Sequence, residues 1–119
     1  MDIKQLLDKV KQRRDYAQVG MIVCHNGVVR GTSRDGRKVN GLRVAVDQAK
    51  LAQTIDNYKA RDGITEILVQ INADRDLAVG DDVMLLVVAG DIRETVIATL
   101  SDTLNEIKAS VTSKTEYFA

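Results

Sequence analysis

Residues 27 to 42 join two apolar stretches through a basic, glycine-containing loop. The first stretch ends in a cation, the second begins at Val39, and four cations lie along the loop and its edges: Arg30, Arg34, Arg37 and Lys38. At the tip of a β-hairpin, such cations beside flexible backbone amides would bind an anionic ligand. A solvated hairpin with ordinary surface charges has the same local sequence, so this segment alone leaves both interpretations open.

Three cations near the end of the chain extend this hypothesis. Arg93 falls in the first turn of an expected helix, where unpaired amides and the helix dipole favour phosphate, although an exposed arginine is the simpler alternative. Lys108 and Lys114 flank the turn after that helix, where a lysine commonly compensates the dipole. If these cations converge, each lowers the pKa of its neighbours and can supply a neutral amine. Spacing alone does not show that they do.

Other reactive residue types give weaker signals. Cys24 and His25 are adjacent in an expected strand, so their side chains point to opposite faces and do not form a thiolate–imidazole pair. Cys24 is expected to be a small buried hydrophobe, and His25 to have a packing or edge role. The acidic segment from Asp74 to Asp82 is predicted to be a solvated turn. No metal site and no cofactor are expected.

The hydrophobic pattern predicts the elements that would position these residues. Helices are expected over residues 2–15 and 47–61 and from Gly90-Asp91 to Ile107, and strands over 21–29, 39–46, 66–71, 83–89 and, at an edge, 111–118. The continuous apolar run 83–89 predicts a central strand buried on both faces. Asp91 and Glu94 have the spacing of a capping box. The alternation of helices and strands along the chain predicts an α+β fold with one layer of sheet covered by helices.

Bulk properties narrow the class of protein. The 119 residues predict a single domain spanning 1–119. The net charge is zero, so no global field would attract nucleic acid or an anionic membrane, and neither is expected as a partner. The longest apolar run is too short to cross a bilayer, and the N-terminal residues lack the apolar region of a signal peptide. A cytoplasmic protein is predicted.

Five motifs between Gly20 and Glu116 are similar to those of the large, catalytic subunit of molybdopterin synthase, the MoaE family. They are Gly27-Val-Val-Arg30, Val39-Asn-Gly-Leu42, the Gly80-Asp81 pair, the helix that begins at Arg93 and ends in Ile107-Lys108, and Ser113-Lys114-Thr115-Glu116. The resemblance covers most of the chain. It identifies the chain as a divergent member of that family.

The resemblance implies a specific reaction. The family has an α/β hammerhead fold, with a mixed sheet covered by helices, and forms a homodimer. Each subunit receives the Gly-Gly tail of a small ubiquitin-like sulfur carrier, whose thiocarboxylate supplies sulfur to cyclic pyranopterin monophosphate and so forms molybdopterin. Carried over to this chain, Lys108 and Lys114 would be catalytic, and Arg30 and Arg93 would hold anionic groups of the substrate. Arg37 and Lys38 of the basic loop are further candidates for substrate binding.

Several residues depart from the family pattern. Ile92 replaces the histidine before the helix arginine, Ile71-Asn72 replaces a His-Arg pair, and the proline and tryptophan before the second lysine are absent. These departures leave two alternatives to a sulfurtransferase. One is a non-catalytic binding or regulatory relative that keeps the fold and the anion pocket. The other is a small enzyme that acts on another phosphorylated metabolite.

Overall fold

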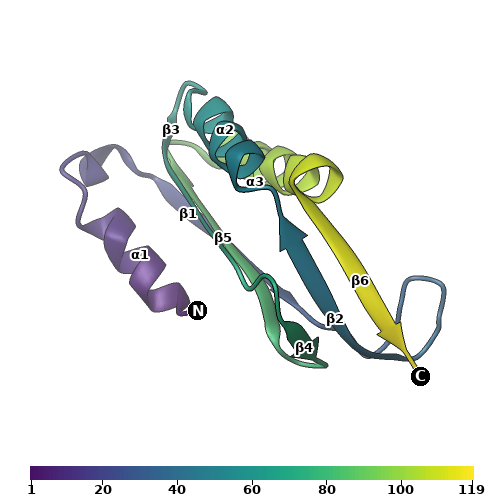
Figure 1. Cartoon of the computed structure of the whole chain (residues 1–119). Coiled ribbons are helices and arrows are strands. Elements are labelled where there is room, and N and C mark those ends of the chain that lie inside the picture. Colours follow the sequence, from purple (N-terminus) through teal and green to yellow (C-terminus); the bar gives the residue numbers. More distant parts are fainter.

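The computed structural model describes all residues from Met1 to Ala119. Its elements follow one another as α1 (Ile3–Lys11), the 3₁₀ turn η1 (Tyr16–Gln18), β1 (Met21–Val28), β2 (Val39–Val46), α2 (Gln48–Lys59), β3 (Ile64–Ile71), β4 (Asp76–Ala78), β5 (Asp82–Gly90), α3 (Arg93–Glu106), the π-helical turn η2 (Ile107–Val111) and β6 (Thr112–Phe118) (Figure 1). None of the helices has the length and apolar composition needed to cross a membrane.

The strands form two separate antiparallel sheets, ordered β1-β5-β3 and β4-β2-β6. The α+β class is confirmed, but the expectation of one mixed layer is wrong. β1 and β2 do not form a hairpin along their lengths, because β1 pairs with β5 whereas β2 pairs with β4 and β6. Only the neck of the connecting loop is paired, at Thr32 and Lys38. The basic loop therefore links the two sheets.

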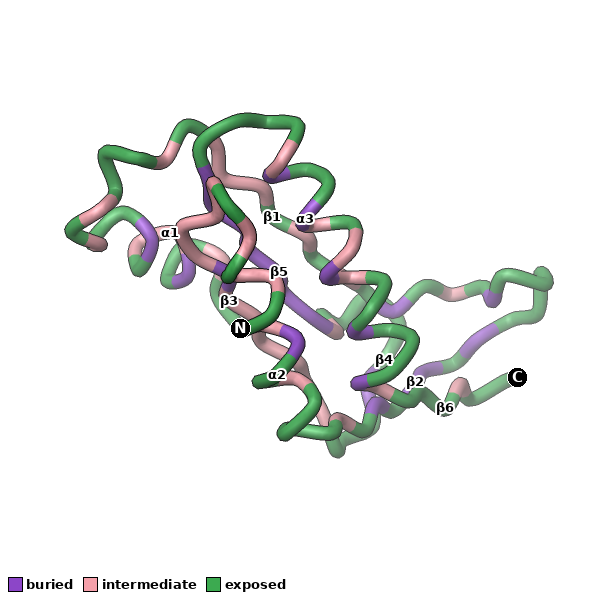
Figure 2. Tube along the Cα trace, turned by 90° about the horizontal axis from the view of Figure 1, so that it is seen from above, coloured by how far each residue is buried: buried purple, intermediate pink, exposed green.

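β5 is the central strand of its sheet and is buried on both faces, as the apolar run predicts. Successive side chains alternate between the faces. Leu85, Val87 and Ala89 pack against α1, whereas Leu86 and Val88 pack beneath α2 and α3. Figure 1 shows α1 on one side of this sheet and the other two helices on the opposite side, and Figure 2 shows the buried stretch running along β5.

The last helix begins at Arg93 but without the predicted capping box. Its N-cap is Ile92, which makes no side-chain capping bond, and the Asp91 carboxylate instead accepts a hydrogen bond from the adjacent Ile92 amide at 2.7 Å. The other end of α3 winds into η2, a wider turn of the kind often found at functional sites. Ile107 and Val111 of this turn are buried against Met84. The turn is thereby anchored to the first sheet.

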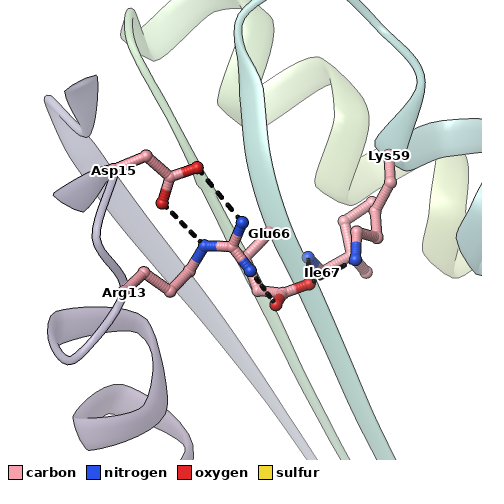
Figure 3. Close-up of polar contacts among 5 residues, drawn as sticks. All are labelled: Arg13, Asp15, Lys59, Glu66 and Ile67. Carbon is pink, nitrogen blue, oxygen red and sulfur yellow. Dashed lines mark hydrogen bonds and ion pairs between the residues drawn. The ribbon is translucent and has the colours of Figure 1, made fainter.

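The N-terminal helix is shorter than predicted because the chain turns after Lys11. The turn brings Arg13 to β3, where its Nη1 donates to Glu66 Oε2 at 2.7 Å, while its Nε and Nη2 donate to both oxygens of Asp15 (Figure 3). Glu66 Oε1 also accepts from the Ile67 amide and pairs with Lys59 Nζ, both at 2.9 Å. This Glu66 cluster ties three segments together across the sheet.

The acidic segment contains a short strand that the sequence analysis missed. β4 pairs with β2, and Leu77 is buried in a small core between the strands. Asp76 accepts hydrogen bonds from the Tyr117 hydroxyl at 2.7 Å and from Arg43 Nη1 at 3.3 Å. The predicted solvated turn is thus wrong for residues 76–78, because long-range partners on β2 and β6 order them.

Candidate functional site

A pocket of about 530 Å³ lies where the two sheets meet the end of α3. Its apolar lining is contributed by both sheets and by η2: Val44, Ile71, Val83, Met84, Ile107 and Phe118. Its polar and charged lining comes from the basic loop, η2 and β6: Ser33, Arg34, Asp35, Lys108, Thr112, Lys114 and Glu116. A pocket of this size that combines apolar and polar side chains is typical of sites for small organic ligands.

The alternation of β6 brings Lys114 into the pocket. Thr112, Lys114, Glu116 and Phe118 all line it, as side chains two residues apart on one face of a strand should. Lys108 reaches the same pocket from η2, six residues earlier in the chain. Both predicted catalytic lysines therefore line one recess, although one belongs to a helical turn and the other to a strand. The side chain of Lys114 is 60% exposed and lies 3.9 Å from Glu116.

The basic loop forms one wall of the pocket through an ordered turn. The Ser33 hydroxyl donates to the Asp35 carboxylate and accepts from the Arg37 amide at 3.1 Å. Gly36 has φ +86°, a conformation that glycine adopts without strain. The Ser33 hydrogen bond holds the pKa of Asp35 below its usual value, so the carboxylate is charged at neutral pH.

The same loop is attached to the end of β6. The Arg37 guanidinium lies 3.6 Å from the centre of the Phe118 ring, and the Ala119 amide donates to the Lys38 carbonyl at 3.1 Å. A guanidinium over an aromatic face is attracted by the ring quadrupole. The loop and the strand that carries Lys114 are thereby held as one wall.

Four of the six predicted site residues do not line the pocket. Arg30 is exposed, and its Nε donates to the Thr32 carbonyl at 2.7 Å. The Arg37 guanidinium lies over the Phe118 ring, and Lys38 is an exposed residue whose backbone pairs at the neck of the loop. The Arg93 side chain is 77% exposed and pairs with its neighbour Glu94 at 3.1 Å. Two arginines and two lysines were expected to converge on one site. Within one chain, only the two lysines line the same pocket.

Arg34 supplies the guanidinium that the sequence assigned elsewhere. The sequence analysis counted it among the loop cations but did not select it as a site residue. Asp35 and Glu116 were also missed, although Glu116 lies two residues from Lys114 and so on the same face of β6. The two-residue period of the strand was the signal in the sequence that could have identified Glu116.

His25 lies beside the site, and Cys24 lies on the opposite face of β1. His25 shares its face with Val23, which packs beneath α3, and burial followed by the positive charge of Lys108 lowers the pKa of its imidazole. Cys24 is exposed rather than buried, so that prediction is wrong. Partial desolvation raises the pKa of the Cys24 thiol, which argues against a nucleophilic role.

The model of the MoaE protein family matches residues 1–110. The chain belongs to the MoaE family. A search of curated proteins found no match. The family match therefore extends over most of the chain.

Solved structures of related proteins have the same fold. A molybdopterin synthase from Staphylococcus aureus is 22% identical, with 91% of this chain and 85% of that chain covered at a TM-score of 0.74. A molybdopterin cofactor biosynthesis protein E from Burkholderia multivorans is 15% identical, with 100% and 86% covered at a TM-score of 0.78. A complex of subunits 1 and 2 of molybdopterin-converting factor from Helicobacter pylori contains a chain that is 19% identical. The match covers 100% of this chain and 84% of that chain, at a TM-score of 0.71.

Proposed function

We propose that this chain transfers sulfur from the C-terminal thiocarboxylate of a small carrier protein to cyclic pyranopterin monophosphate, forming molybdopterin. Membership in the MoaE family supports a role in molybdenum cofactor biosynthesis. The observation that carries the proposal is the presence of Lys108 and Lys114, from different elements, in one pocket. Acyl sulfur transfer requires cations where negative charge develops and a group that can donate a proton. Two lysines can fill both roles.

The shape of the pocket is compatible with these reactants. Its apolar floor can cover the body of a pterin, and its volume also admits the end of a flexible peptide. The solved complex of two molybdopterin-converting factor subunits supports a small sulfur-carrier partner. We also propose that residues 1–119 form one cytoplasmic domain that acts as a homodimer. The contribution of both sheets to the pocket supports a single domain.

Reconstitution tests the reaction directly. Purified chain is mixed with thiocarboxylated carrier and pyranopterin precursor, and dithiolene product is measured for the wild type and for Lys114→Ala. Product from the wild type and a large loss in the variant are expected. Arg14→Gln is the matched control, because Arg14 is exposed and lies outside the pocket. No product from the folded wild type would contradict the proposed reaction.

A non-catalytic binding relative is the second candidate. The exposure of Arg93 and its pairing with Glu94 favour it, because the arginine of the family motif then does not line the pocket. Such a protein would retain a small Gly-Gly-tailed partner in a pull-down but form no product. Binding together with turnover would exclude this candidate.

A further inference from the structure

The charged groups that line the pocket differ in whether they have partners. Glu116 lies 3.9 Å from Lys114, and Asp35 accepts from Ser33 and is further stabilised by the nearby Arg37. Arg34 and Lys108 make no ion pair in the structure. These two side chains are therefore the cations of the pocket that form no ion pair with a carboxylate.

Arg34 owes its position to a loop that is already ordered. Its neighbour Ser33 is buried and bonded on both sides, to the Asp35 carboxylate and to the Arg37 amide. The loop closes through further backbone bonds, from the Ser33 amide to the Arg37 carbonyl and from the Val39 amide to the Gly31 carbonyl. Ordering a cation before its ligand arrives reduces the entropy lost on binding. The Arg34 backbone is thus fixed while its guanidinium remains free to bind.

We propose that Arg34 and Lys108 together bind one oxyanion group of the ligand, and that Arg34 is the guanidinium of this site in place of Arg30 and Arg93. Arginine presents a planar fork that matches phosphate or carboxylate, and lysine adds a compact charge. The apolar floor formed by Met84 and Ile107 would contact the organic part of the same ligand. The identity of the natural ligand rests on the proposed function, but the binding of an oxyanion does not.

Two sources could supply the oxyanion, the phosphate of a small molecule or the terminal carboxylate of a peptide. Phenyl phosphate is the probe for the first, since it combines a phosphate with an apolar ring. The second is probed with a short peptide that ends in Gly-Gly, compared with the same peptide as its C-terminal amide. Dissociation constants are measured by NMR titration for the wild type and for Arg34→Gln, Lys108→Gln and Arg14→Gln.

Both pocket substitutions should weaken binding of the preferred probe about tenfold or more, the loss expected for one charge-assisted hydrogen bond. Arg14→Gln removes the same charge outside the pocket and should leave binding unchanged. Arg34→Lys should retain part of the affinity, because it keeps the charge but loses the fork. Loss of phenyl phosphate binding in the pocket variants would identify a phosphate site. Loss of binding of the free-carboxylate peptide in these variants, with no effect on binding of the peptide amide, would identify a peptide-terminus site.

Two results would overturn the assignment. One is a wild type that binds neither probe, and the other is a folded Arg34→Gln protein with unchanged affinity for both. Amide spectra of each variant verify the fold. The test is separate from the proposed reaction, because no carrier or precursor is present. If the wild type forms dithiolene product but Arg34→Gln binds the probes as tightly as the wild type, only the Arg34 assignment is rejected. If probe binding depends on Arg34 but the wild type forms no product, only the proposed reaction is rejected.

Discussion

The Glu66 cluster and the pocket contain similar numbers of charged residues but use them differently. In the Glu66 cluster, Arg13 and Lys59 share a carboxylate whose side chain is only 13% exposed, and Asp15 takes the remaining donors of Arg13. In the pocket, Arg34 and Lys108 have no such partner. The first arrangement joins segments of the chain, whereas the second leaves cations free for a ligand. The number of charges alone does not separate these roles, but the pairing of the charges does.

The largest difference between the effect on activity and the effect on stability is expected from Lys108→Gln. If Lys108 stabilises charge in sulfur transfer, the rate of dithiolene formation should fall by about 100-fold or more. Lys108 is exposed and unpaired, so the free energy of unfolding should change by less than about 0.5 kcal/mol. Single-turnover assays and urea denaturation measure the two quantities on the same preparation. A variant that loses stability and activity together would break the distinction between the regions.

Glu66→Gln should have the opposite pattern. Two cations would lose their shared carboxylate in a largely buried position, and we expect a loss of about 2–4 kcal/mol in the free energy of unfolding. Affinity for phenyl phosphate in the folded protein should be unchanged, because Glu66 does not line the pocket. Asp15→Asn is the milder control, since Asp15 is more exposed and Glu66 would still hold Arg13. Equal losses in the two variants would contradict a central role for Glu66.

Ser33→Ala tests whether the loop positions Arg34. Removing the hydroxyl deletes one side-chain bond to Asp35 and one bond from the Arg37 amide, so affinity for the oxyanion probe should fall roughly two- to fivefold. The pKa of Asp35 should rise toward its ordinary value, because the Ser33 hydrogen bond is the main cause of its lowering. An NMR titration reports both. An unchanged Asp35 pKa would show that the Ser33 hydroxyl does not bond this carboxylate, and unchanged affinity would show that it does not position Arg34.

The smallest expected effect concerns pH. Burial and the charge of Lys108 lower the pKa of His25 below its ordinary 6.5, so the unfolded chain binds more protons than the native one. This contribution to stability is complete above about pH 6.5 and is lost as the pH falls through the lowered native pKa. Because His25 is the only histidine, its ring resonance can be titrated without overlap. Lys108→Gln should raise its pKa, and Arg14→Gln should not.

Most of the individual elements could be predicted from the local hydrophobic pattern. The uninterrupted run in β5 indicated burial on both faces, and the alternation near the C-terminus indicated the edge strand β6. The division into two sheets could not be predicted, because it depends on the pairing of β2 with β6 rather than with β1. Strand β4 was missed for the same reason. Its three residues are ordered by Tyr117 and Arg43, which are distant in sequence.

The candidate site divides in a similar way. The convergence of Lys108 and Lys114 was a hypothesis that the structure supports, since both line one pocket. The choice of arginine could not be made from the sequence. Which of the four loop cations lines the pocket depends on the Ser33–Asp35 bond and on the contact of Arg37 with Phe118. These contacts occupy one guanidinium and leave another free, and residue type alone does not contain that information.

The π-helical turn η2 determines where the chain can change length. It lies between the two lysines, and its wider winding can absorb an inserted or deleted residue without moving the strand that follows. The same change between Thr112 and Lys114 would reverse the phase of the strand and turn Lys114 away from Lys108. We therefore expect relatives that keep both amines together to vary in length before Thr112 and to keep the spacing from Thr112 to Lys114.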